Sequence, residues 1–133
     1  MPSIYITIGI LNDDIELTKD ILESLFSTST SFEEHESDYW GEYIITKLST
    51  SEEIKVGYNY IDDDWREEDY KQCPLLIELI NPQNPEEITK CICDNFRNAI
   101  PIRMREIEPN SYVKNYIFKY GKFCVISEKY LKK

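Results

Sequence analysis

The chain has 133 residues, of which 41% are hydrophobic and 13% aromatic, enough to build one domain with a hydrophobic core. We therefore expect a single domain spanning residues 1–133. Its formal net charge of -10 argues against nucleic acid as a partner, because binding to a phosphate backbone requires clustered Lys and Arg. A basic protein surface is the expected counterpart.

The opening Met-Pro-Ser-Ile-Tyr-Ile lacks the basic start of a signal peptide, and no apolar run approaches the roughly 18 residues that a membrane helix needs. The sequence thus predicts a cytoplasmic protein without a membrane partner. In that compartment cysteines are usually reduced. We expect buried free thiols at all four cysteines, Cys73, Cys91, Cys93 and Cys124.

Negative charge is concentrated in the middle third of the chain. Between Glu33 and Asp69 there are 13 acids and three bases, so this segment carries the whole net charge. From Arg97 to the end, nine bases outnumber three acids. A run of acids is often only a solvated surface, but this concentration favours an electrostatic role.

The first elements expected are a strand and a helix. Alternating isoleucines over 4–10 indicate a strand with one buried face. Apolar residues at helical spacing predict a helix over 13–26, beginning at a capping box formed by Asp13 and Glu16. The polar run 27–31 predicts an exposed connection.

The middle of the chain predicts three further strands. Aromatic and β-branched residues over 39–48 and 54–61 suit a hairpin with a loop of about five residues. A charged connection follows over 62–72. The largely apolar run 74–80 predicts a central strand that is buried on both faces.

The last third predicts a helix and a meander of strands. Asn84-Pro85-Glu86-Glu87 is a strong helix start, and we expect the helix to end at Pro101. Strands are predicted over 102–108, 112–119 and 122–127. The order β-α-β-β-β-α-β-β-β indicates an α+β fold: one mainly antiparallel sheet of six to seven strands, with two helices packed on one face.

No pattern typical of catalysis or of metal binding stands out. His35 is the single histidine and has no nucleophile motif near it. On a helix the sulfurs of Cys91 and Cys93 would point about 200° apart, which suits one metal ion poorly. Asp62-Asp63-Asp64 lacks the spacing of a calcium loop, and the chain has no glycine-rich phosphate loop. We therefore predict no catalytic residue, no metal and no cofactor.

Aromatic residues interleave with the acids of the middle third, as in Tyr39-Trp40-Gly41-Glu42-Tyr43 and Asp62-Asp63-Asp64-Trp65. Aromatic anchors within a polar rim are typical of protein interfaces. For Tyr43 an ordinary place in a strand is the favoured interpretation, whereas Trp65 is flanked by acids and is harder to place in a core. The residues that we predict to bind a partner are Glu33, Glu34, Glu36, Asp38, Trp40, Asp62, Asp63, Asp64, Trp65, Glu67, Glu68, Asp69 and Tyr70.

These features resemble the immunity proteins of bacterial polymorphic toxin systems, such as those of contact-dependent growth inhibition. The resemblance runs from Tyr39-Trp40-Gly41-Glu42-Tyr43 through Trp65 and Pro74-Leu75-Leu76-Ile77-Glu78-Leu79 to Asn84-Pro85-Glu86-Glu87. It implies an inhibitor that binds and neutralises a cognate toxin domain, for example a nuclease whose basic cleft the acids would occupy as phosphate mimics. It carries no defined site residues with it.

Two other functions remain open. The chain could be an adaptor or regulatory module for another basic protein, using the same acidic surface. It could also be a small enzyme with a carboxylate-based site, which would need a concave pocket holding two or more buried acids of perturbed pKa. In every binding scheme, the acidic segments 33–38 and 62–69 form one surface only if they lie at the same end of the sheet.

Overall fold

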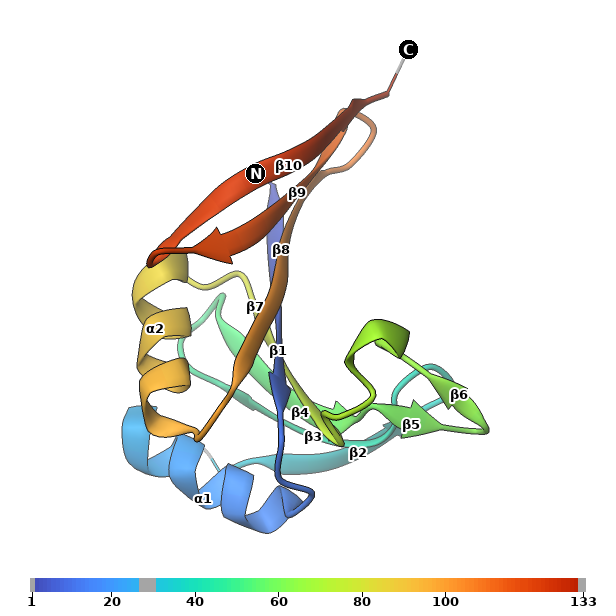
Figure 1. Ribbon diagram of the computed structural model, residues 1–133, viewed down its shortest axis with the longest axis vertical. Coiled ribbons are helices and arrows are strands. Elements are labelled where there is room, and N and C mark those ends of the chain that lie inside the picture. Colours follow the sequence, from blue (N-terminus) through green and yellow to red (C-terminus); the bar gives the residue numbers. More distant parts are fainter. Residues whose placement is uncertain (1, 27–30, 132–133) are drawn as a thin grey trace.

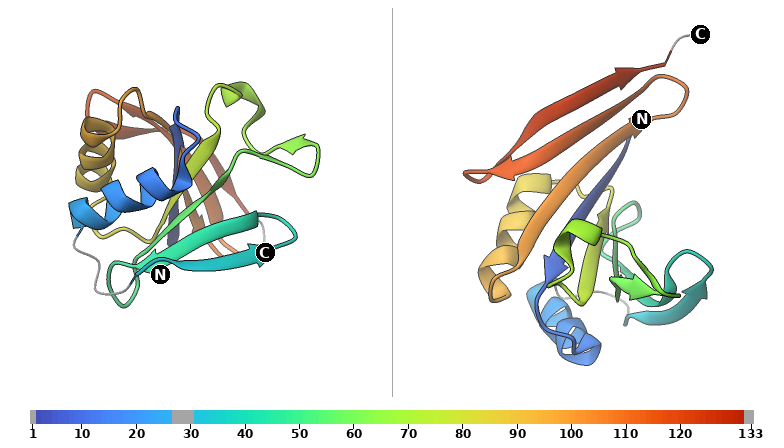
Figure 2. Two further views of the ribbon diagram at one scale, coloured as in Figure 1. Left: turned by 90° about the horizontal axis from the view of Figure 1, so that it is seen from below. Right: turned by 45° about the vertical axis from the view of Figure 1, so that its right-hand side comes forward.

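The computed structural model describes residues 2–26 and 31–131, which form two helices and a large sheet (Figures 1 and 2). Residues 27–30, most of the expected Ser/Thr connection, lie outside the described part. The helices are α1 (Ile15–Phe26) and α2 (Pro85–Asn95). The strands of the main sheet are β1 (Ser3–Ile10), β2 (Glu33–Ser37), β3 (Gly41–Lys47), β4 (Glu53–Tyr58), β7 (Leu75–Ile80), β8 (Ile100–Glu108), β9 (Tyr112–Lys119) and β10 (Lys122–Tyr130).

The main sheet has the order β10-β9-β8-β1-β7-β4-β3-β2, and all its neighbouring strands are antiparallel. The predicted α+β fold with a mainly antiparallel sheet is therefore confirmed. The sheet has eight strands, however, and not the six to seven expected. The additional strand is β2, which the sequence predicts as a connection because Glu-Glu-His-Glu-Ser has no apolar alternation.

The core lies between the sheet and the two helices, which cover the same face (Figure 2). Ile6 and Ile8 of β1 are fully buried there, and Leu22 of α1 and Ile92 of α2 pack into the same cluster. Because side chains alternate along a strand, Thr7 lies on the opposite face. We call this second face, which neither α1 nor α2 covers, the open face.

Both helices differ in their ends from the expectation. Asp14, one residue after the predicted cap, accepts a hydrogen bond from the backbone N–H of Leu17 at 3.0 Å, so α1 begins at Ile15. Helix α2 begins at Pro85 as expected but ends at Asn95. Pro101 does not end it: this residue belongs to β8, in a part of that strand that pairs with β1 and not with β9.

Residues 60–73 leave the sheet between β4 and β7, and we call this segment the excursion. It starts with a two-stranded ribbon of β5 (Tyr60–Ile61) and β6 (Asp64–Trp65) and continues into a short 3-10 helix (Glu68–Tyr70). Asp62 and Asp63 join β5 to β6 with φ values of 51° and 62°. Positive φ at both central residues defines a type I′ turn, which Asp tolerates better than most residues do.

All four cysteines are free thiols, as expected, but they are not all buried. Cys73 is buried, Cys91 and Cys93 are half-buried, and Cys124 is exposed on β10, where the prediction of a buried thiol is wrong. This strand is an edge of the sheet and pairs only with β9. Neither of the helices seen here has the length and apolar character required to cross a membrane.

Candidate functional site

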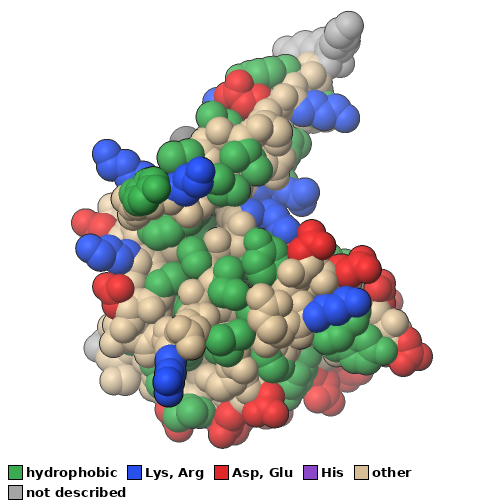
Figure 3. Space-filling view, in the orientation of Figure 1, with side chains coloured by type: hydrophobic (Ala, Val, Ile, Leu, Met, Phe, Trp, Pro, Cys, Tyr) green, Lys and Arg blue, Asp and Glu red, His purple; other side chains and the backbone are tan. Residues whose placement is uncertain are grey.

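Acids from two separate segments meet at one end of the molecule. Asp38, in the turn between β2 and β3, lines a pocket of about 310 Å³ together with Asp62 and Asp64 of the excursion. Tyr39 and Trp65 line the same pocket. We call Asp38, Tyr39 and residues 60–65 the acidic end. In the space-filling view, acidic side chains gather around the part that carries β5 and β6, whereas basic side chains are more frequent over β9 and β10 (Figure 3).

Arg66 attaches the excursion to the turn that carries Asp38. Its guanidinium carbon lies 3.8 Å from the ring centre of Tyr39 and 4.3 Å from that of Trp40, and its Nη1 donates to the carbonyl of Tyr39. Cation–aromatic contacts of this kind contribute about 0.5–2 kcal/mol each. Burial lowers the pKa of Arg66, although the charge of Glu78 opposes that shift. One cation thus holds two acidic segments side by side.

Asn59 closes the base of the excursion through a buried polar network. Its side chain is fully buried, and its Nδ2 donates to the carbonyls of Tyr70 and Cys73, both at 3.0 Å. Its Oδ1 accepts from the backbone N–H of Glu67 at 2.8 Å, and its own N–H donates to the carbonyl of Pro74. The excursion leaves the main sheet, so its backbone groups cannot pair with the neighbouring strands. The hydrogen bonds of Asn59 satisfy several of these groups.

Glu67 points inward and not toward solvent. Both of its carboxylate oxygens accept from Arg103 of β8, at 2.5 and 2.6 Å, and its side chain is only 15% exposed. This bidentate ion pair ties the far part of the excursion to the open face of the sheet. The hydrogen bond to Glu67 also raises the pKa of Arg103. Glu67 was predicted to bind a partner, but its carboxylate is engaged within the molecule.

Other predicted partner-binding residues are distributed more widely. Glu33 lies at the far end of β2, opposite Ile45, and its carboxylate contacts His35 at 3.3 Å. Trp40 packs on the open face, where an added Cβ at Gly57 would lie 2.7 Å from its ring. The remaining predicted residues of the excursion, Glu68, Asp69 and Tyr70, form the 3-10 helix beyond the inward-pointing Glu67.

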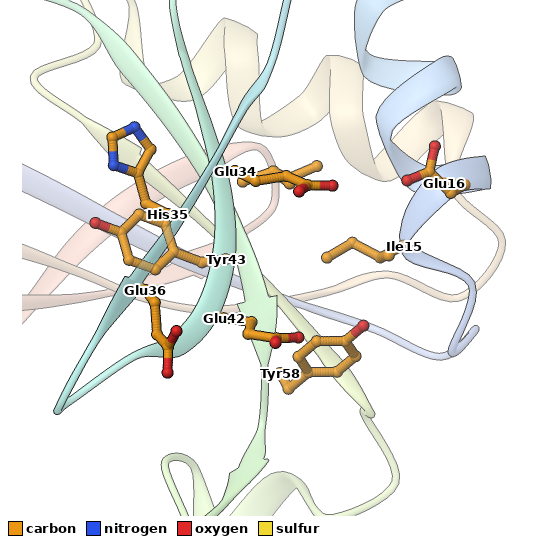
Figure 4. A pocket seen from close by; sticks show the side chains of 9 residues that line it. Ile15, Glu16, Glu34, His35, Glu36, Glu42, Tyr43 and Tyr58 are labelled. Atoms are coloured by element: carbon orange, nitrogen blue, oxygen red, sulfur yellow. The ribbon is translucent and has the colours of Figure 1, made fainter.

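Two more of the predicted acids, Glu34 and Glu36, line a pocket of about 360 Å³ on the helix side of β2 and β3. Glu34 and Glu42 extend toward Glu16 and Tyr58, while His35 lies on the other side of the strand (Figure 4). All four carboxylates are exposed. Within the described ranges, no group of three His, Cys, Asp or Glu side chains is placed to hold a metal ion.

A second feature occupies the open face beside the acidic end. A cavity of about 660 Å³, which we call the open-face cavity, is lined by Tyr5, Thr7, Tyr39, Trp40, Arg66, Glu67, Glu78, Arg103, Arg105 and Ile107. The strand register sets Arg103, Thr7, Glu78 and Lys55 in one row across β8, β1, β7 and β4. Burial raises the pKa of Glu78, while the charges of Lys55 and Arg66 act in the opposite direction.

Sequence reasoning missed several residues that build this site. Tyr39 and Tyr60 are the aromatic side chains most exposed at the acidic end, at 72% and 50%, whereas the sequence predicts Trp40 and Trp65 as the aromatic contacts. Asn59 and Arg103 were also missed. Polar residues inside otherwise apolar or β-branched strands, such as Asn59 and Glu78, were a usable signal, because such residues need a partner when they are buried.

Comparison with known proteins adds no assignment. No protein-family model, no curated protein and no solved structure matches the chain.

Proposed function

We propose that this protein is an inhibitor of the immunity type, whose acidic end docks onto a basic surface of a cognate toxin domain. The observation that carries the proposal is the convergence of Asp38 with Asp62 and Asp64 in one pocket. Exposed Tyr39 and Tyr60 stand beside these acids. Tyrosines within a charged rim have the composition of a protein interface.

The internal contacts of the excursion support a preorganised surface. The Asn59 network and the ion pair of Glu67 with Arg103 hold both flanks of the acidic ribbon. A surface that is ordered before binding loses less conformational entropy on association. On a nuclease, the acids would take the positions of substrate phosphates in the cleft, and their field would accelerate encounter at low salt.

The small-enzyme alternative receives less support. Glu67 and Glu78 both line the open-face cavity, but both oxygens of Glu67 accept from Arg103. Glu78 is partly buried, and this burial raises its pKa. A general acid and base pair would need two carboxyls that are free to exchange protons. The adaptor alternative uses the same acidic end and differs only in the partner.

Co-expression with the product of the adjacent upstream gene tests the proposal. We expect growth rescue and co-purification with the wild-type chain. Replacing Asp62, Asp63 and Asp64 by Asn should abolish both, and Asn is chosen because it tolerates the positive φ at positions 62 and 63. The matched control, Asp20→Asn with Glu23→Gln and Asp94→Asn, removes equal charge from the helices. If the wild-type chain gives no growth rescue and does not co-purify, the proposal is overturned. Co-purification without rescue would favour an adaptor.

A further inference from the structure

The open-face cavity differs in charge from the rest of the molecule. In a chain of net charge -10, three arginines face this one cavity, against the carboxylates of Glu67 and Glu78. Its volume of about 660 Å³ falls within the range of small-molecule sites, roughly 300–1,000 Å³. Tyr5, Trp40 and Ile107 supply apolar wall.

The three arginines are not equivalent. Arg103 is neutralised by its bidentate pair with Glu67, and Arg66 is stacked on Tyr39 and Trp40, although its buried Nη2 has no hydrogen-bond partner among the described residues. Arg105 is exposed, and in the described part of the chain its one hydrogen bond runs from Nε to Oδ1 of Asn115 at 3.5 Å. The Arg105 guanidinium therefore has donor capacity left for a ligand.

The charges around the cavity limit the kind of anion that it can hold. With both carboxylates ionised, three arginines leave a net charge of only about one positive unit, which matches one carboxylate better than a phosphate dianion. A planar guanidinium also pairs with a carboxylate through two parallel hydrogen bonds. The aromatic and aliphatic walls favour an apolar body on the ligand.

We propose that the open-face cavity binds a small organic monocarboxylate with an apolar or aromatic body, and that Arg105 receives the carboxylate. The cavity belongs to the sheet face of β1, β7 and β8, and its occupation does not require that the acidic end bind a toxin. The carboxylate of Glu78 lines the same cavity as the arginines. Its negative charge repels a bound anion and therefore limits the affinity for any anion.

Titration with benzoate, followed by the NMR signals of the arginine Nε–Hε groups, tests this site. We expect a saturable shift of the Arg105 signal with a dissociation constant below about 10 mM (an affinity stronger than about 3 kcal/mol). Inorganic phosphate at the same ionic strength should bind at least fivefold more weakly. No saturation by benzoate up to 50 mM, or phosphate binding as tightly as benzoate, would overturn the proposal.

Three variants locate the interaction. Arg105→Gln should weaken benzoate binding at least tenfold, Arg105→Lys should weaken it less, and Glu78→Gln should strengthen it. Arg97→Gln is the matched control. Arg97 is exposed and does not line the cavity, so this substitution removes the same charge outside the site. Equal weakening by Arg97→Gln and Arg105→Gln would assign the effect to net charge and would contradict a role for Arg105.

Discussion

Arg103 of β8 holds the carboxylate of Glu67 with both terminal nitrogens, although the two residues lie 36 positions apart in the chain. This pair fixes the chain to the sheet just after the ribbon of β5 and β6, and the neighbouring Arg66 fixes it to the turn at Tyr39. Before the ribbon, Asn59 donates to the carbonyls of Tyr70 and Cys73, so the acidic ribbon projects from fixed points on both of its sides. Its position does not depend on the ribbon's own two short strands.

The ion pair predicts an energetic coupling between its two members. Glu67→Gln should lower the free energy of unfolding by about 2 kcal/mol, because it removes a charge-assisted acceptor from a largely buried site. Arg103→Gln should cost a similar amount, and the double variant should cost less than the sum of the two. A double-mutant cycle in urea should give a coupling of about 1–2 kcal/mol. A coupling near zero would show that the pair does not anchor the excursion.

The Asn59 network predicts a strong local destabilisation on truncation. Asn59→Ala leaves the carbonyl of Cys73 and the N–H of Glu67 without this partner, while the carbonyl of Tyr70 keeps the N–H of Cys73, and the loss should cost about 3 kcal/mol in urea unfolding. Asn95→Ala is the control: its exposed amide also donates to a backbone carbonyl, and its loss should cost about 0.5 kcal/mol. Equal costs for the two substitutions would contradict the network.

The raised pKa of Glu78 predicts a pH-dependent stability. The unfolded chain releases this proton at the ordinary carboxyl value of 4.5, whereas the folded chain retains it to higher pH. The unfolded state binds fewer protons in that interval, so the free energy of unfolding falls as the pH rises through it. Glu78→Gln removes this effect, and its stability relative to wild type should increase from pH 4 to pH 7. Parallel pH profiles for the two proteins would show that Glu78 ionises normally.

The close contact between Gly57 and the indole of Trp40 gives a further prediction. A Cβ at this position would approach Cε3 of Trp40 to 2.7 Å, so Gly57→Ala should displace the indole and cost about 1–3 kcal/mol. In a Trp40→Leu background the same substitution should cost much less. Urea unfolding measures both costs, and Trp40 emission in a Trp65→Phe protein reports the displacement. An unchanged cost in the Trp40→Leu background would place Trp40 elsewhere.

The elements with apolar periodicity were predictable, because burial imposes that periodicity on the sequence. Strand β1 and both helices follow this rule. Strand β2 does not, since an edge strand with four exposed residues needs only backbone pairing to β3. For the I′ turn at Asp62 and Asp63 the sequence predicts only a charged connection, because Asp-Asp is a weaker hairpin signal than Asn-Gly.

The candidate site was predictable in composition but not in arrangement. The sequence singles out Asp38 and residues 62–64 as acids of two segments, and the fold brings Asp38 together with Asp62 and Asp64. The inward orientation of Glu67 depends on Arg103 of a distant strand, so no local pattern could indicate it. The same holds for Trp40, whose packing depends on the absence of a side chain at Gly57.

The affinity of the chain for its co-purified basic partner, measured by calorimetry at two salt concentrations, tests the role of the acidic end most directly. We predict that replacing Asp62, Asp63 and Asp64 by Asn weakens binding at least tenfold at low salt and that the difference shrinks at 0.5 M salt, roughly where the screening length falls below 5 Å. The control with Asp20, Glu23 and Asp94 neutralised should bind within twofold of wild type. Equal affinity of wild type and the acidic-end variant would contradict docking through the acidic end.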